Sequence, residues 1–85
     1  RDALTLAVEA SVAATAIDDK YVRGYVRGAK ALLILGDYGD GDVKALRRAR
    51  EMLQKALNVD PTHGGATSTL KDVNISLQLF DDDSD

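Results

Sequence analysis

Residues 21–35, YVRGYVRGAKALLIL, decide the fold of this chain. Apolar residues recur in this stretch at intervals of three and four, the spacing of one face of an α-helix: Val22, Tyr25, Val26, Ala29, Leu32 and Leu33. Gly36 follows, and we expect it to end the helix. The pattern predicts a helix with one side against a core.

Three more helices are expected around this one, over about 2–17, 43–58 and 66–79, because turn-forming residues separate them. Asp42 is well placed to cap the third helix. Short connections make neighbouring helices antiparallel, so the sequence predicts an all-α fold of about four helices in antiparallel hairpins. The core-facing stripes are expected to be Ala3, Ala7, Ala10 or Ser11, and Ala14; Leu46, Ala49, Leu53, Ala56 and Leu57; and Leu70, Val73, Leu77 and Phe80.

The composition excludes several classes of protein. A net charge of −3 argues against a general nucleic-acid binder, which usually has a basic excess. The chain has no cysteine, so it has neither a disulfide framework nor a thiolate metal site. No apolar run approaches the roughly 20 residues of a membrane span. We expect a cytoplasmic or cytosol-facing protein, excised from a longer chain.

Two helices end in similar sequences, ATAIDD at 14–19 and ALNVDP at 56–61. Each has an alanine, further helical residues and an acidic break, which indicates an internal repeat. The order of large, small and corner residues resembles that of a tetratricopeptide repeat (TPR), an α–α solenoid. The matching positions are Tyr25, Ala29, Leu32, the corner Leu35-Gly36-Asp37-Tyr38, Ala49, Leu53, Ala56 and Asp60-Pro61.

The resemblance implies that residues 1–80 are a TPR-like fragment. Residues 1–17 would be the second helix of a truncated repeat, 21–60 one full repeat with a lengthened loop between its helices, and 66–80 a capping helix. Residues 81–85 would be an acidic tail. A lone repeat cannot bury its apolar face, so the fragment is expected to be only marginally stable or to pair with a second copy as a homodimer.

Arg23, Arg27 and Lys30 lie on one face of the helix expected over 21–35. Their arrangement is similar to the third repeat of co-chaperone TPR domains, where a Lys-x-x-x-Arg pair grips the C-terminal carboxylates of heat-shock chaperones. That resemblance implies that Arg23 and Arg27 contact an acidic peptide in a concave groove, with Lys30 and Tyr25 as groove neighbours. The alternative is that these cations form a solvated helix face.

The remaining candidates favour structural roles. Lys44, Arg47, Arg48, Arg50 and Lys55 make the third helix basic, but without the interleaved aromatics of an RNA-binding surface. Asp37, Asp40 and Asp42 lack the spacing of a calcium loop. His63 is the only histidine and has no obvious nucleophile or companion ligand. We therefore expect no enzyme activity, no cofactor and no metal.

The sequence favours a protein–protein interaction module whose partner is an acidic peptide, such as the C-terminal tail of a heat-shock chaperone. The alternative is an assembly or dimerisation scaffold that uses the apolar face of the first or last helix. Gly24 and Gly28, four residues apart, would permit the close helix contacts that either role needs.

Overall fold

A computed structural model describes residues 2–37 and 43–80. They form four helices, α1 (Ala3–Ile17), α2 (Val22–Asp37), α3 (Val43–Val59) and α4 (Gly64–Phe80), and no strand occurs in these two ranges. The predicted all-α fold of four helices is confirmed. Three features expected from the sequence lie outside the described residues: the corner residue Tyr38, the cap at Asp42 and the acidic tail over 81–85.

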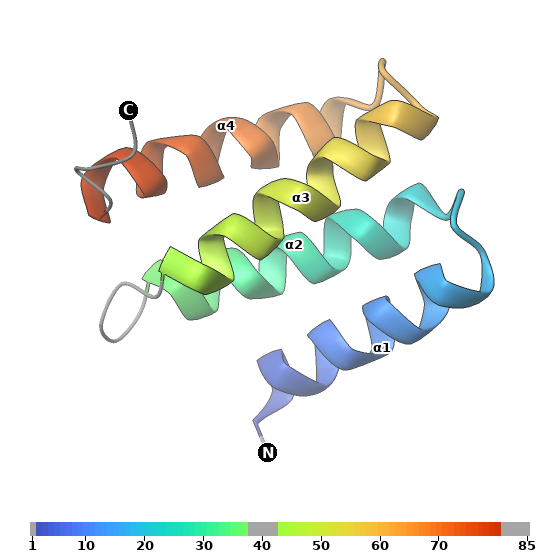
Figure 1. The fold of residues 1–85 in the computed structure, drawn as a ribbon, viewed down its shortest axis with the longest axis horizontal. Helices are drawn as coiled ribbons and strands as arrows, with labels where there is room; N and C mark the ends of the chain where they lie inside the picture. The colour runs from blue at the N-terminus through green and yellow to red at the C-terminus, as the bar shows by residue number, and fades with distance from the viewer. Residues whose placement is uncertain (1, 38–42, 81–85) are drawn as a thin grey trace.

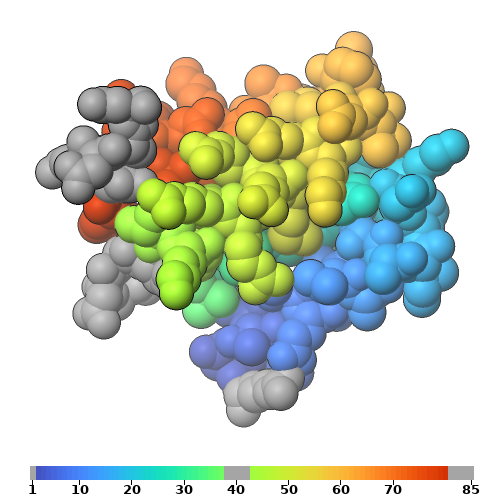
Figure 2. All heavy atoms as spheres, in the orientation of Figure 1, coloured from blue at the N-terminus to red at the C-terminus, as the bar shows by residue number. Residues whose placement is uncertain are grey.

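The helices form a flat molecule, with extents of 34 × 32 × 17 Å. The helices α1 and α4 are its two edges, and α2 and α3 lie between them (Figure 1). In the packing of the helices, α2 contacts all three others, whereas α1 packs only against α2. Figure 2, in the same orientation, shows α3 across the middle of the visible surface and α1 along its lower edge.

Small residues allow the helices to approach closely. The alanines Ala29, Ala49, Ala56 and Ala66 are fully buried, and the largest side chains with no exposure are Leu46, Leu53 and Val73. Ala29, Ala49 and Ala56 are also small positions in the repeat pattern that the sequence resembles. A larger side chain at any of them would overpack the interface.

Gly28 of α2 lies at a close contact of three helices. A Cβ atom added there would lie 2.5 Å from Met52 Cε in α3 and 2.9 Å from Ser11 Cβ in α1. Gly24, one turn earlier, would place a Cβ 2.9 Å from Thr15 Cγ2 and 2.8 Å from Tyr21 Cδ2. The two glycines therefore let α2 touch α1, and at Gly28 also α3, as the sequence predicted.

The two short turns, between α1 and α2 and between α3 and α4, have the same hydrogen bonds. At each helix end the aspartate N–H donates to an alanine carbonyl four residues back, Asp18 to Ala14 (3.0 Å) and Asp60 to Ala56 (2.9 Å). Each aspartate Oδ1 then accepts from the backbone N–H two residues on, from Lys20 and Thr62, both at 3.1 Å. The sequence repeat is therefore also a structural one, an Asx-type turn used twice.

Several local predictions were wrong. Gly36 does not end α2, because the helix continues to Asp37 with Gly36 buried inside it. In α1, Ala3 is exposed. Of the alternatives Ala10 and Ser11, Ser11 is buried and Ala10 is exposed, and the other buried residues are Val8 and Thr15. Because α1 is apolar on every side, the spacing of its apolar residues does not indicate which side faces the core.

The last helix also differs at both ends from its prediction. It begins at Gly64, two residues before its expected start, so Gly64 and Gly65 form its first turn. His63 precedes this turn, and its Nδ1 accepts from the Ala66 N–H at 3.0 Å as an N-terminal cap. Phe80, expected in the core, is 46% exposed at the other end of the helix.

Substituting two glycines by alanine should have opposite effects on stability. Gly28→Ala should destabilise the fold by about 1–3 kcal/mol, because Ser11 Cβ cannot move aside as the end of Met52 can. Gly64→Ala meets nothing within 4 Å and should stabilise the fold by about 0.4–1 kcal/mol. Urea unfolding of both variants measures the two free energies. Equal effects would mean that Gly28 is not at a close contact.

Asp60 should make stability depend on pH in the acid range. The Thr62 hydroxyl (2.8 Å) and backbone N–H (3.1 Å) donate to Asp60 and lower its pKa below the ordinary value of 3.8. This stabilisation is present above pH 3.8 and is lost as the pH falls through the lowered pKa. Asp60→Asn keeps the acceptor oxygen without the charge. Thermal unfolding between neutral pH and pH 3 should therefore show a smaller loss for this variant than for the native chain, and an equal loss would contradict the assignment.

Candidate functional site

The helix α2 is buried on most sides and exposes a single narrow stripe. The exposed residues recur once per turn along the helix: Arg23, Arg27, Lys30, Ile34 and Asp37. The three cations that the sequence placed on one face are therefore side by side at the surface. Tight packing of the rest of α2 fixes the backbone beneath them.

The three cations of the stripe have no interaction partner within the described residues. The side chains of Arg23, Arg27 and Lys30 form neither a hydrogen bond nor an ion pair there. An exposed guanidinium without a partner keeps its donors directed at solvent, where they can receive a carboxylate in a two-point contact. The three cations therefore make this part of the α2 surface positively charged, and Asp37 gives its far end the opposite sign.

Tyr25 does not belong to this stripe. Its side chain is 7% exposed and its hydroxyl donates to the Asp19 carbonyl oxygen at 2.9 Å, which ties α2 to the turn after α1. The sequence assigned Tyr25 both to the core-facing side and to the groove. The apolar spacing with Val22 and Val26 was the better of these two signals.

A shallow hollow of about 280 Å³ lies beside the stripe, between α1 and α2. Small residues leave this space open, and Tyr21 and Arg27 border it; the lining residues are Ala7, Ala10, Ser11, Ala14, Tyr21, Gly24 and Arg27. Arg27 therefore belongs both to the exposed stripe and to the border of this hollow. The sequence did not predict the hollow, because it requires the register of two helices.

A larger, mostly apolar groove of about 760 Å³ lies between α1 and α3. Leu32 and Leu35 of α2 contribute to it, as do Val8 and Val12 of α1. Its polar residues stand on both sides, Thr5 and Glu9 on α1 and Lys44 and Arg48 on α3. The groove exists because α1 and α3 both pack on α2 and not on each other.

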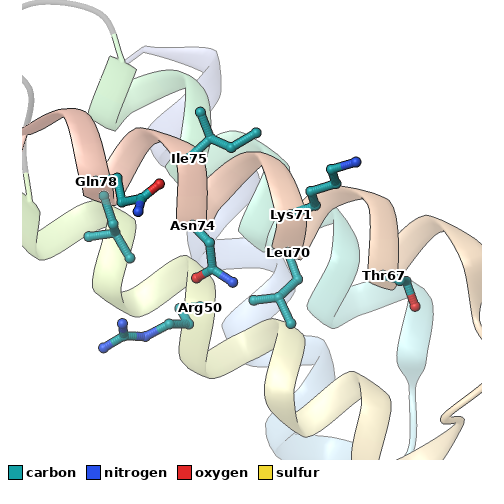
Figure 3. Close-up of a pocket in the computed structure, with 8 residues that line it drawn as sticks. Arg50, Thr67, Leu70, Lys71, Asn74, Ile75 and Gln78 are labelled. Carbon is teal, nitrogen blue, oxygen red and sulfur yellow. The ribbon is translucent and has the colours of Figure 1, made fainter. Parts of the chain in front are cut away.

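A third groove, of about 580 Å³, runs between α3 and α4 and is more polar. Asn74 and Leu70 point from α4 toward α3, while Lys71 and Ile75 project from the other side of α4 (Figure 3). Arg50 of α3 extends along the facing side. Neither Arg50 nor Lys71 has an ion-pair partner within the described residues, so this groove also offers positive charge to a ligand.

In the described part of the chain, side chains that could bind a metal are not brought together. Within 2–37 and 43–80, no group of three or more histidine or acidic side chains is arranged to hold a metal ion. His63 serves as the cap of α4. Of the acidic run considered as a calcium loop, Asp37 is described at the end of α2, and Asp40 and Asp42 lie outside the described residues.

None of the helices in the described part of the chain combines the length and apolar character needed to cross a membrane. Comparison of the chain with protein-family models, with curated proteins and with solved structures finds no match in any of the three.

Tyr25→Phe should separate a packing role from a ligand-binding one. Removing the hydroxyl leaves the Asp19 carbonyl without this donor, at an expected cost of about 0.5–1.5 kcal/mol in the free energy of unfolding. Affinity for an acidic peptide should not change, because the ring is buried. Urea unfolding and peptide titration of the same variant check both statements. Weakened binding with an unchanged free energy of unfolding would mean that Tyr25 is part of the binding site.

Proposed function

We propose that this chain is a helical protein-interaction module of the TPR type, and that it binds an extended acidic peptide along α2. The observation that carries the proposal is the exposed stripe of α2, whose first three members are cations without a partner among the described residues. Arg23 and Arg27 would bind carboxylates, and Lys30 would extend the site along the helix.

The spacing of the cations suits an extended ligand. Residues four apart on a helix are separated by about 6 Å along its axis. Alternate side chains of an extended peptide lie about 6.6–6.8 Å apart on the same face. Acidic residues at alternate positions, or an acidic residue two positions before a free carboxylate, can therefore reach Arg23 and Arg27 together.

The hollow between α1 and α2 supports a preference for a peptide with both acidic and apolar residues. Arg27 belongs to the stripe and also borders the hollow. A carboxylate on Arg27 would place a neighbouring apolar side chain over Gly24 and Ala14. Because the helices hold these residues in position before binding, little ordering cost falls on the protein.

The assignment to the TPR type rests on two features. Buried alanines at helix contacts agree with the small positions of the repeat, and the matching turns agree with a repeating helical unit. In such arrays each unit packs on its sequence neighbours, as α1, α2, α3 and α4 do here.

Fluorescence anisotropy tests the binding function. The probe is a labelled acidic peptide that ends in Glu-Glu-Val-Asp, titrated with the 85-residue chain. Combining Arg23→Ala with Arg27→Ala should weaken binding by at least about tenfold, because each arginine supplies a charge-assisted contact. Amidation of the peptide carboxylate should weaken binding as well. Circular dichroism confirms that the helices persist.

A charge-matched control locates the site. Combining Arg50→Ala with Lys71→Ala removes the same charge from the groove between α3 and α4 and should leave the affinity close to that of the native chain. If this control weakens binding as much as the α2 double variant does, the chain attracts the peptide only by its general charge. If the native chain does not bind the peptide, the acidic-peptide function is wrong.

A further inference from the structure

The groove between α1 and α3 is larger than the other two hollows described above, and most of its lining is apolar. Seven of its eleven lining residues carry apolar side chains. Leu32 of α2, which is 3% exposed, forms the floor, and Val8 and Val12 of α1 belong to one wall. Both walls lie on the face of the molecule that Figure 2 shows.

The polar lining residues gather at one end of this groove. The helices α1 and α3 both run antiparallel to α2, so they begin at the same end of the molecule (Figure 1). Thr5 and Glu9 lie in the first half of α1, and Lys44 and Arg48 lie in the first two turns of α3. The groove continues along α1 to Ala16, about 16 Å from Thr5, and every α1 lining residue after Glu9 is apolar. The groove therefore has a charged end and an apolar end.

Of the three charged residues that line the groove, Arg48 is the one available to a ligand. Glu9 and Lys44 each have an interaction already. Arg48 is exposed and has no partner within 2–37 and 43–80. A guanidinium binds a carboxylate through two parallel hydrogen bonds. The groove therefore suits a ligand with one carboxylate and an elongated apolar body.

The size of the groove favours a small molecule over a protein partner. Its volume of about 760 Å³ lies within the range of roughly 300–1,000 Å³ that is typical of small-molecule sites. A specific protein interface uses about 20–30 residues on each side, whereas eleven residues line this groove. A charged end and an apolar end also match the head and the tail of a single-chain amphiphile.

We propose that this groove binds a fatty acid, with the carboxylate on Arg48 and the alkyl chain along α1 over Val12 and Ala16. The chain would cover side chains that otherwise face water, since Val12 is 44% exposed and Ala16 is exposed as well. The groove between α3 and α4 lacks this division into two ends, because its polar residues recur along α4 from Thr67 to Gln78.

The fatty-acid site is separate from the proposed peptide site. Lys30 and Leu32 are two residues apart, so their side chains point in directions that differ by roughly 200° around α2. Lys30 is exposed in the stripe of cations, whereas Leu32 is the floor of the groove. A peptide along the stripe and a fatty acid in the groove would therefore occupy opposite sides of α2.

Isothermal titration calorimetry with dodecanoate, below the concentration at which it forms micelles, tests the site. The 85-residue chain should bind one dodecanoate. Arg48→Gln should weaken binding by at least about tenfold, because it removes the charge-assisted contact. Lys55→Gln removes the same charge from an exposed position of α3 outside the groove and should leave the affinity unchanged. Dodecanol has no carboxylate, so Arg48→Gln should not alter its binding.

Two further variants test the position of the alkyl chain. Ala13→Asp places a charge at the apolar end of the groove and should weaken dodecanoate binding by at least about tenfold. Ile17→Asp changes a residue of the same helix that is 88% exposed and outside the groove, and should have no effect. Octanoate should bind the native chain more weakly than dodecanoate, because each buried CH₂ contributes a factor of about four. Circular dichroism confirms that the variants remain helical.

Three results of the calorimetry would overturn the proposal. They are no binding of dodecanoate, binding of many dodecanoates per chain, and equal losses for Arg48→Gln and Lys55→Gln, which would indicate attraction by general charge. The calorimetry uses no peptide, so it stands even if the acidic-peptide function is wrong. Where the labelled peptide binds, dodecanoate should leave its affinity unchanged. Displacement of the peptide would place dodecanoate on the α2 stripe and not in the groove.

Discussion

The close approach of α2 to its neighbours at Gly28 is the constraint on which the rest of the structure depends. The missing side chain lets Ser11 of α1 and Met52 of α3 reach the same point of α2 from two sides. Buried alanines extend this contact along α2 and α3. As a result α2 is enclosed almost entirely, and the few side chains it leaves at the surface stand on a backbone that has little freedom to move. Binding surfaces benefit from this rigidity, because positions are fixed before a ligand arrives.

The sequence could predict those parts of the fold that depend on one helix at a time. In α2 and α3 the apolar residues occupy one side, so their spacing alone identified Tyr25, Ala29, Leu46 and Leu53 as core. In α1 the same method selected Ala3, which is exposed, and could not decide between Ala10, which is exposed, and Ser11, which is buried, because every side of that helix is apolar. Gly36 was misjudged for a related reason: glycine ends many helices, but here it is buried within the last turn of α2.

The candidate binding surfaces also differ in whether the sequence of a single helix can predict them. The row formed by Arg23, Arg27 and Lys30 follows from helical spacing, and the structure places all three at the surface. The hollow beside Arg27 and the grooves flanking α3 arise where two or three helices meet, so no single stretch of sequence contains them. His63 had a role that composition does not suggest, since histidine is not among the residues usually preferred at a helix start.

The position of α1 has a consequence for how the molecule comes apart. Because α1 packs on α2 alone, it can separate from the other three helices without opening the Leu46–Leu53–Val73 core. Stability in such a chain is distributed unevenly, with the edge helix opening first and the centre last. Its amide hydrogens would exchange with solvent before those of α2 and α3. A molecule bound to the outer side of α1 would then oppose the separation of α1 from α2, and so would stabilise the helix that opens first.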